Sequence, residues 1–316
     1  MDRVLLDARR RSCRRAVLCV LAVLFATSGT AWAFQAGPEP SSSDPTALER
    51  EVIAALSGHT EIRPGLKLAN RFTPENKQEA RTYLIAVLSR CGLEGKRQTY
   101  GADSENVYAT LPGTEPTADA VVIGAHYDSV RSAPGANDDG TGVAAVLAIA
   151  QQMSQVHPRR RDIIFVFFDE EERGHVGSRN FAQMLKDQQR PIHSVHTIDQ
   201  VGWDQNHNRA IELESPYDGA VEQYQHAAVA LQLAIPILTT NETGSDHLSF
   251  RQLGYKAVGI TEEYRHGDTT PFIHKAGDTF ETIDFDYLAS TTRLMVEVMK
   301  MIVNEHAGGS GPASDQ

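Results

Sequence analysis

One stretch of the 316-residue sequence, VVIGAHYDSVRSAPGANDDGTGVAA at 121–145, constrains the fold most strongly. It opens with a short apolar run bounded by turn residues, the pattern of a strand that is buried on both faces. A Pro/Gly loop then delivers Asp138 and Asp139 to the start of an apolar helix, where negative charge is favoured by the helix dipole. The stretch therefore predicts a strand, a loop and a helix of an α/β fold.

The same alternation continues along the chain. Apolar periodicity and turn residues predict helices over 46–56, 74–91, 141–156, 176–189, 216–233, 246–253 and 284–303. They predict strands over 96–100, 106–111, 121–125, 162–168, 194–198, 210–213 and 257–261. Strands that alternate with helices favour a three-layer αβα sandwich with a mixed, largely parallel central sheet. The two strands before residue 112 fit an antiparallel edge of that sheet.

The two ends of the chain differ from its middle. Residues 1–33 combine clustered arginines, a short apolar run and an AxA site, which predicts a signal peptide cut after Ala33 and a secreted or periplasmic protein. The apolar run is too short to span a bilayer comfortably, so no stable membrane association is expected after cleavage. Pro/Ser/Gly-rich composition predicts a disordered lead-in over 34–45 and a disordered tail over 307–316. A single domain is expected over 46–306.

Charge and cysteine content exclude some functions. Removing residues 1–33 takes away six Arg and two Asp, which moves the formal charge from −11 to −15. Such an acidic chain is a poor candidate for binding nucleic acid or anionic membranes. Cys91 alone remains after cleavage, so the mature chain cannot form an internal disulfide.

His126 and Asp128 come just past the first buried strand, at the sheet edge where ligands collect in open α/β folds. Because side chains alternate along an extended chain, both lie on the same side, and Asp128 could accept the second ring N–H of a metal-bound His126. The alternatives are a satisfied polar histidine and, for NDDG, a solvated turn or helix cap.

Further acidic residues and a histidine follow other predicted strands. The run Asp169–Glu172 leaves the most apolar strand, DIIFVFF, and like charges at such a place are unfavourable unless cations hold them. Asp199 ends another strand, and SDH occurs at 245–247. His274 lies in a loop with Asp278 four residues on, an arrangement typical of a metal ligand with an acidic orienter.

Together these residues predict a metal centre. Two histidines with three or four carboxylates and no thiolate suit zinc, and the carboxylates suffice for two Zn²⁺ ions that share a bridging acid. Two adjacent glutamates allow one to bind metal while its neighbour acts as a base, which is the logic of two-metal hydrolysis.

Six motifs in this order, HYDS, PGANDDGTG, EEERGHVGS, TIDQVGW, GSDH and FIHKAGDT, resemble those of the dinuclear zinc exopeptidases. The likeness covers about residues 45–305 and is greatest to the bacterial leucyl aminopeptidase type. Glutamate carboxypeptidases, glutaminyl cyclases and the non-catalytic transferrin receptor are related. The resemblance implies a zinc-dependent metallo-exopeptidase, most simply an aminopeptidase acting on peptides with a free N-terminus.

The resemblance also implies a role for each site residue. His126 and Glu172 would hold one zinc, Asp199 and His274 would hold the other, and Asp138 would bridge them.

Glu171 would be the general base that takes a proton from a metal-bridged water to give the attacking hydroxide and hands it to the leaving amine, and Asp128 would orient His126. In relatives the peptide between Asp138 and Asp139 is cis.

The sequence departs from the family pattern before GSDH, where Glu242 or a neighbour stands in place of a tyrosine found in well-known aminopeptidases. Tyr264 or His266 could take over carbonyl stabilisation. An apolar specificity pocket is expected from segments around four aromatic residues, Trp203, Phe250, Tyr264 and Phe272. Glu170 or Glu242 could anchor the substrate's ammonium group.

Other functions on the same fold remain open. A glutaminyl cyclase would usually place Trp where Ile273 stands, and a carboxypeptidase would need a cationic clamp such as Arg265. A non-catalytic binding protein would have lost metal ligands, whereas all five positions are intact. The absence of HExxH and GxSxG speaks against thermolysin-type proteases and lipase-like hydrolases.

Overall fold

The structure is a computed structural model that describes residues 45–115 and 119–305. The predicted signal peptide and the predicted tail lie outside the described residues. The lead-in expected over 34–45 meets the described chain at Pro45, which is the first residue of a helix, a position that proline tolerates well. The described residues belong to one unit, 40–316, and the bounds of 46–306 stay a prediction.

The centre of the fold is an eight-stranded sheet in the order β1-β2-β4-β3-β5-β8-β6-β7. Its strands are β1 (Lys96–Thr99), β2 (Glu105–Leu111), β3 (Ala120–His126), β4 (Ile163–Phe168), β5 (Ile192–Ile198), β6 (Ile211–Glu214), β7 (Ile237–Thr240) and β8 (Ala257–Thr261). The four central strands β4, β3, β5 and β8 are parallel. The β1-β2 pair joins β4 in antiparallel fashion, which confirms the predicted edge. β6 is antiparallel to β8, so the sheet is mixed and largely parallel.

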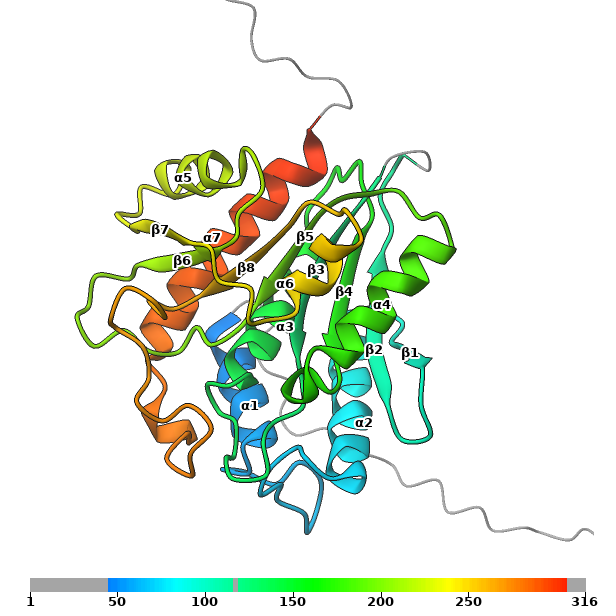
Figure 1. Ribbon diagram of the computed structural model, residues 1–316, viewed down its shortest axis with the longest axis vertical. Coiled ribbons are helices and arrows are strands. Elements are labelled where there is room, and N and C mark those ends of the chain that lie inside the picture. The colour runs from blue at the N-terminus through cyan, green and yellow to red at the C-terminus, as the bar shows by residue number, and fades with distance from the viewer. Residues whose placement is uncertain (1–44, 116–118, 306–316) are drawn as a thin grey trace, which may run out of the picture. The chain divides into compact units, whose positions relative to one another are not determined.

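Helices cover both faces of the sheet. They are α1 (Pro45–Leu56), α2 (Pro74–Arg90), α3 (Gly140–Ser154), α4 (Val176–Asp187), α5 (Ala220–Ala230), α6 (His247–Gln252) and α7 (Phe285–Asn304), with short 3₁₀ turns η1 (Glu171–Arg173) and η2 (Phe280–Thr282). In Figure 1, α4 and α6 lie in front of the sheet, and α3 and α7 lie behind it. This is the predicted three-layer αβα arrangement.

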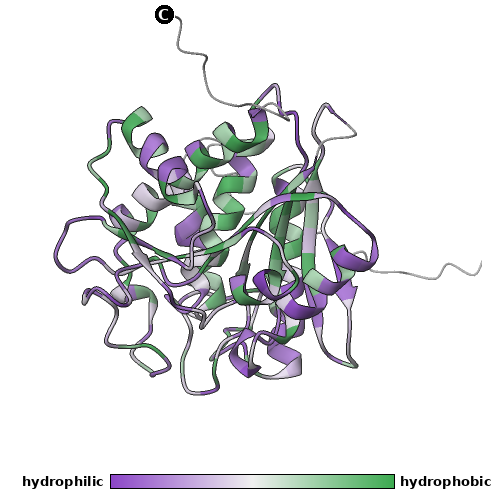
Figure 2. Cartoon of the chain, turned by 45° about the horizontal axis from the view of Figure 1, so that its top comes forward, coloured by the Kyte–Doolittle hydropathy of each residue, from purple (hydrophilic) through white to green (hydrophobic). Residues whose placement is uncertain are grey.

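Strand β4 shows why two layers of helices are needed. Its residues Ile163, Phe165 and Phe167 join the core beneath α1, α3 and α7, while the alternate residues pack against α4 and α6. Figure 2 shows the apolar colouring gathered on these inner strands and on the helix faces that meet them. A strand buried on both faces needs apolar side chains at every position, which is what DIIFVFF supplies.

Two predictions of local structure need correction. The helix expected over 216–233 is confined to Ala220–Ala230, because the chain first turns through Gly219, whose φ of 89° lies in the left-handed region. Strand β7 was not predicted, since ILTT is short and lacks clear alternation. No helix in the described part of the chain is long and apolar enough to cross a membrane.

Candidate metal centre

The candidate site lies where β3, β4 and β5 end. His126 is the last residue of β3 and is buried, and its Nδ1 lies 3.4 Å from Oδ1 of Asp128. Asp128 Oδ1 also accepts a hydrogen bond from the backbone N–H of Glu171 at 3.1 Å. Asp128 therefore lies where it was predicted, beside the ring nitrogen of His126 that faces away from the other acids.

Asp138 lies at the middle of the site, between two histidines. Its Oδ1 is 3.2 Å from Nε2 of His126, and its Oδ2 is 3.2 Å from Nε2 of His274. Burial raises the pKa of Asp138, but the nearby imidazoles of His126 and His274 outweigh that effect and hold it below the usual value. One carboxylate thus offers a different oxygen to each of two ligand groups.

The grouping of the remaining ligands differs from the expected pairing. One group is His126, Asp138 and Asp199, and the other is Asp138, Glu172 and His274. Nε2 of His126 is 3.6 Å from Asp199 Oδ1, and Nε2 of His274 is 3.0 Å from Glu172 Oε2. The expectation that His126 would pair with Glu172 is wrong, because β3 neighbours β5 as well as β4 and His126 points toward Asp199.

These residues fit divalent metal ions. Among the described residues, neither ring nitrogen of the buried His126 has a hydrogen-bond partner, and the same holds for Glu172 Oε1 and Asp199 Oδ1. Buried polar atoms are normally satisfied, so unpaired atoms that face one another mark a place for a further group. Nitrogen and oxygen ligands of a tetrahedral zinc stand about 3.3 to 3.5 Å apart, close to the separations found here.

Asp139 fixes the loop that carries Asp138. It is the N-cap of α3, and its carboxylate accepts hydrogen bonds from the N–H groups of Gly142, Gln200 and His126. A Cβ on Gly142 would come within 2.4 Å of that carboxylate, so the close approach requires glycine. The peptide between Asp138 and Asp139 is cis, as in the family that the sequence resembles.

Two further side chains hold this loop, and neither was predicted to do so. Arg71 is fully buried and donates hydrogen bonds to the carbonyls of four residues, Leu56, Tyr127, Pro134 and Gly135. Asp278 accepts from the N–H groups of Asn137 and Asp138. The expected role of Asp278 as orienter of His274 is therefore replaced by a role in shaping the loop before α3.

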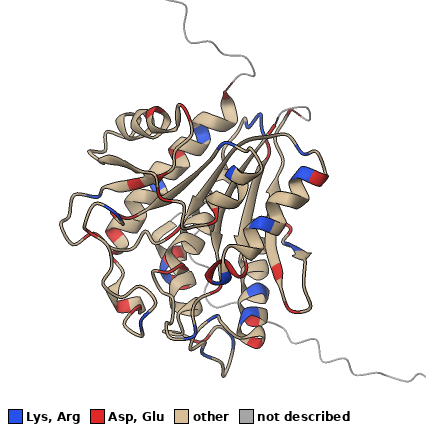
Figure 3. Cartoon of the chain, viewed as in Figure 1, with Lys and Arg blue, Asp and Glu red and all other residues tan. Residues whose placement is uncertain are grey.

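The acidic run after β4 is divided into two halves. Asp169 is paired with Lys77 at 2.9 Å and with Arg81 at 3.5 Å, and Glu170 lies 3.5 Å from Lys77. Both basic residues are buried on one face of α2. The argument that this run needs metal cations is wrong for its first two members, which have side-chain cations of their own. Figure 3 shows the run as a red loop at the end of β4.

The second half of the run faces the candidate metals. Glu171 and Glu172 begin η1, and burial raises the pKa of Glu171 well above its usual value. Its Oε1 lies 3.1 Å from Nε2 of His175. Glu171, the predicted base, and Glu172, the predicted ligand, are therefore adjacent, but Glu171 contacts His175 whereas Glu172 contacts His274.

A cavity of about 150 Å³ opens beside these groups. Its lining comprises Asp138, Glu171, Glu172, Asp199, Gln200, Glu214, Glu242, Gly244, Ser245, Thr261, Tyr264, Ile273 and His274. Of the four aromatic residues expected there, Tyr264 alone is among the lining residues. Phe250 is buried in the core with Phe168, and Trp203 packs edge-on against Phe272. The expected apolar lining is wrong for these three, and the cavity is mainly polar and acidic.

The acids expected to anchor a substrate ammonium also have partners. Glu170 is bound by Lys77 and Arg173 and does not line the cavity. Glu242 lines it, but its carboxylate accepts from Nε of Arg265 at 2.6 Å and also contacts Nη2. His266, one of two proposed substitutes for the missing tyrosine, is tied to Glu212 at 2.6 Å, whereas Tyr264 reaches the cavity.

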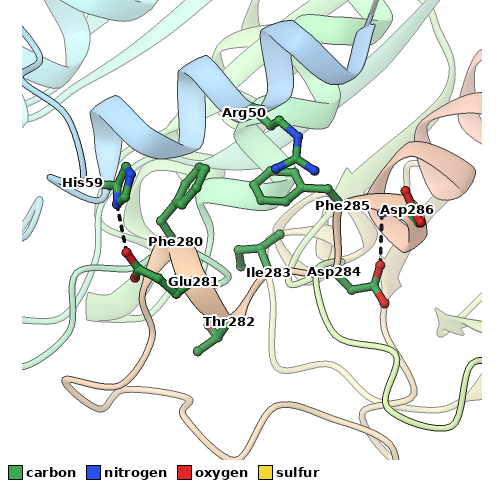
Figure 4. Close-up of a pocket in the computed structure, with 9 residues that line it drawn as sticks. All are labelled: Arg50, His59, Phe280, Glu281, Thr282, Ile283, Asp284, Phe285 and Asp286. Atoms are coloured by element: carbon green, nitrogen blue, oxygen red, sulfur yellow. Dashed lines mark hydrogen bonds and ion pairs between the residues drawn. The ribbon is translucent and has the colours of Figure 1, made fainter.

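A larger, shallow depression of about 680 Å³ runs along α1 and the start of α7. Figure 4 shows that its side chains are engaged with one another: His59 contacts Glu281, and Arg50 lies over Phe285. None of the predicted site residues lines it. The smaller cavity at the strand ends is therefore the candidate active site.

Two His/carboxylate groups that share one aspartate, on an αβα sandwich, are suited to two-metal hydrolysis. Comparison with known proteins agrees with this class. The sequence model of peptidase family M28 matches residues 106–299, more than half of the chain. The chain therefore belongs to peptidase family M28.

Individual relatives carry aminopeptidase names. Over 211 residues the chain is 29% identical to leucine aminopeptidase 1 of Paracoccidioides brasiliensis, a match that covers 60% of this chain and 53% of that protein. The chain thus spans about half the length of that relative. Among solved structures, LapB from Legionella pneumophila has a TM-score of 0.72 at 21% identity, with 83% and 73% of the two chains covered. A zinc aminopeptidase from Bacillus subtilis has a TM-score of 0.58 at 25% identity, with 65% and 52% covered.

Proposed function

We propose that this M28 family member is a zinc-dependent aminopeptidase that removes single residues from the free N-termini of peptides. The observation that carries the proposal is the position of Asp138. One of its carboxylate oxygens faces His126, which is grouped with Asp199, and the other faces His274, which is grouped with Glu172. Names of relatives support the choice of zinc and of an aminopeptidase. Export, which rests on the predicted signal peptide at 1–33, is part of the same proposal.

We assign the ligand sets from the two groups of side chains. One Zn²⁺ would be held by His126 and Asp199, the other by Glu172 and His274, with Asp138 shared. Bound zinc would supply a water of lowered pKa and would polarise the scissile carbonyl.

The other side chains then have distinct tasks. Glu171 lines the cavity beside the ligands without belonging to either group, and we assign to it the general base that takes a proton from the attacking water and returns it to the leaving amine. Asp128 would orient His126 through Nδ1. Ser245 donates to Asp199 Oδ2 at 2.9 Å and so fixes that ligand. Tyr264 is the lining phenol available to the carbonyl oxygen.

The direct test uses the zinc-loaded mature chain with aminoacyl p-nitroanilides and their N-acetylated forms. The proposal expects cleavage of free but not of acetylated substrates. Cyclisation of an N-terminal Gln peptide without cleavage would indicate a glutaminyl cyclase instead, and release of C-terminal residues would indicate a carboxypeptidase. Against the latter, the cationic clamp it would need, Arg265, is engaged by Glu242.

Two variants separate catalysis from metal binding. Glu171→Gln should lower kcat by about 100- to 10,000-fold, the typical contribution of a general base, and should still bind two zinc ions per chain. Asp138→Ala should lose both ions, because it removes a ligand from each group. Zinc content is measured by elemental analysis after dialysis. A Glu171→Gln protein without zinc, or an Asp138→Ala protein that keeps two ions, would contradict the assignment of roles.

A further inference from the structure

The part of the cavity beyond the metal ligands contains acceptors that lack donors. Glu214 ends β6, lines the cavity and is 5% exposed. No hydrogen bond reaches its carboxylate from the described residues. Gln200 also lines the cavity, is 7% exposed, and its Oε1 has no hydrogen-bond partner in the described chain. A buried acceptor such as Gln200 Oε1 is normally satisfied, so it indicates a group that brings a donor, and the Glu214 carboxylate lines the same cavity.

The backbone is built to place Glu214 there. Glu214 pairs with Gly259 of β8 across the antiparallel ladder, and a Cβ on Gly259 would lie only 2.5 Å from Glu214 Oε2. The missing side chain of Gly259 therefore makes room for the carboxylate to lie over β8. Gly259 is the residue type that such a close approach requires.

The histidine next to Glu214 does not neutralise it. Nδ1 of His247 lies 3.5 Å from Glu214 Oε2, while its Nε2 lies 3.1 Å from the carbonyl oxygen of Glu242. Because a carbonyl oxygen only accepts, Nε2 carries the proton. Burial lowers the pKa of His247 to about 4, so the ring is neutral near pH 7 and presents a bare nitrogen to Glu214.

The surroundings of Glu214 are otherwise acidic. Burial raises its pKa to about 8, and the carboxylates of Asp199 and Glu242 act in the same direction. Two cations lie nearby and both are engaged: Arg265 binds Glu242, and Arg251 donates to the carbonyls of Ser215 and Ala257. A cationic ligand group would favour the ionised form of Glu214 and would also bring donors to the unpaired acceptors.

We infer that the cavity is the side-chain pocket for the residue removed, and that it selects lysine or arginine, with Glu214 receiving the side-chain cation. The inference rests on the proposed aminopeptidase function and adds the substrate class. Gln200 would accept a second hydrogen bond, since an ammonium offers three donors and a guanidinium five. Ile273 and Tyr264 offer surface for the methylene stem.

The closing experiment compares lysine with norleucine, which has a similar unbranched stem but no ammonium. With p-nitroanilides, kcat/KM for Lys should exceed that for norleucine by about 10- to 100-fold, the range for a buried charge-assisted hydrogen bond. Glu214→Gln should bring the ratio close to 1, chiefly by lowering kcat/KM for Lys. Glu222→Gln, which makes the same chemical change at an exposed position of α5, should keep the wild-type ratio.

A binding measurement makes the test independent of turnover. Calorimetric titration of L-lysinamide and L-norleucinamide into the zinc-loaded protein should show tighter binding of lysinamide, and Glu214→Gln should remove the difference. Norleucine equal to or better than lysine in either assay overturns the inference. So does a Glu214→Gln protein that loses both substrates equally, since that would place the α-ammonium at Glu214. Absence of any p-nitroanilide cleavage refutes the aminopeptidase proposal. The relative binding of lysinamide and norleucinamide would still test whether the pocket prefers a cationic side chain.

Discussion

A buried histidine on β5 gives a prediction about acid stability that does not involve the metal centre. His196 is fully buried, and its ring contacts Tyr224 Oη at 2.9 Å and Ser194 Oγ at 3.0 Å. Burial lowers the pKa of His196 to about 3. In the unfolded chain an ordinary histidine titrates at about 6.5, so between these values the unfolded state binds a proton that the folded state does not.

The sign and size follow from this difference. The contribution of His196 to the free energy of unfolding is fully present above pH 6.5 and is lost as the pH falls toward 3. Below about pH 6.5 the loss has a slope of about 1.4 kcal/mol per pH unit, so lowering the pH from 7.5 to 5.0 costs about 2 kcal/mol. His196→Gln keeps a polar side chain that does not titrate, so this part of the acid sensitivity should disappear.

The assay is urea unfolding of EDTA-treated protein at pH 7.5 and pH 5.0, so that metal release does not contribute. Wild type should lose about 2 kcal/mol more than His196→Gln between the two pH values. His226→Gln, at an exposed position of α5, should behave like wild type. Equal losses for wild type and His196→Gln, or an NMR titration of His196 near pH 6.5 in the folded protein, would refute the reasoning.

Two other substitutions test how the site is supported. Ser245→Ala removes the hydrogen bond to Asp199 Oδ2 and should weaken zinc retention by about 10-fold in a chelator competition, the low end for such supporting contacts. Unchanged retention would mean that Asp199 is held by its other neighbours. Arg71→Met removes the side-chain donor from four backbone carbonyls, of which that of Gly135 keeps the N–H of Gly140, and should lower the unfolding free energy of the metal-free protein by about 3 to 5 kcal/mol in urea. Arg293→Met, at an exposed position of α7, is the control, and equal stability of the two variants would contradict the role of Arg71.

The fold was predictable because its strongest signals are local. The run at β4 is apolar at every position, and Thr73 before Pro74 caps α2 as the sequence indicates. Strand β7 has neither signal, since it lies at the sheet edge and its residues are only partly buried. The turn before α5 depends on Gly219, and a glycine can continue a helix or precede one.

The residues of the candidate metal centre could be selected from the sequence, but their grouping could not. Each candidate residue follows a predicted strand or lies in a glycine-rich loop, so local patterns identify it. The grouping depends on sheet order, which puts β3 between β4 and β5, and chain order does not reveal that. Arg71 gave no signal, because a single arginine in a loop acquires its four carbonyl partners only when α1 and the loop after β3 meet.

The pocket was mispredicted for a related reason. Phe250 belongs to α6, a short helix whose apolar face packs on the sheet, so it lies in the core with Phe168. In the sequence, Glu214 directly follows the short predicted strand at 210–213, a place where a solvent-exposed polar residue is common. Its burial results from a neighbour on another strand, Gly259, which leaves space where other residues would have a Cβ. The sequence does not mark such cross-strand pairs.

The acidic run after β4 shows how one segment serves both stability and chemistry. Asp169 and Glu170 are held by Lys77 and Arg81, which lie four residues apart and therefore share one face of α2. This pairing anchors the start of the run in the protein interior, where removing one partner of a buried ion pair costs about 3 to 5 kcal/mol. The next two residues, Glu171 and Glu172, extend from that anchor into the cavity. The ion pairs thus hold the start of the loop that carries the proposed ligand and the proposed base.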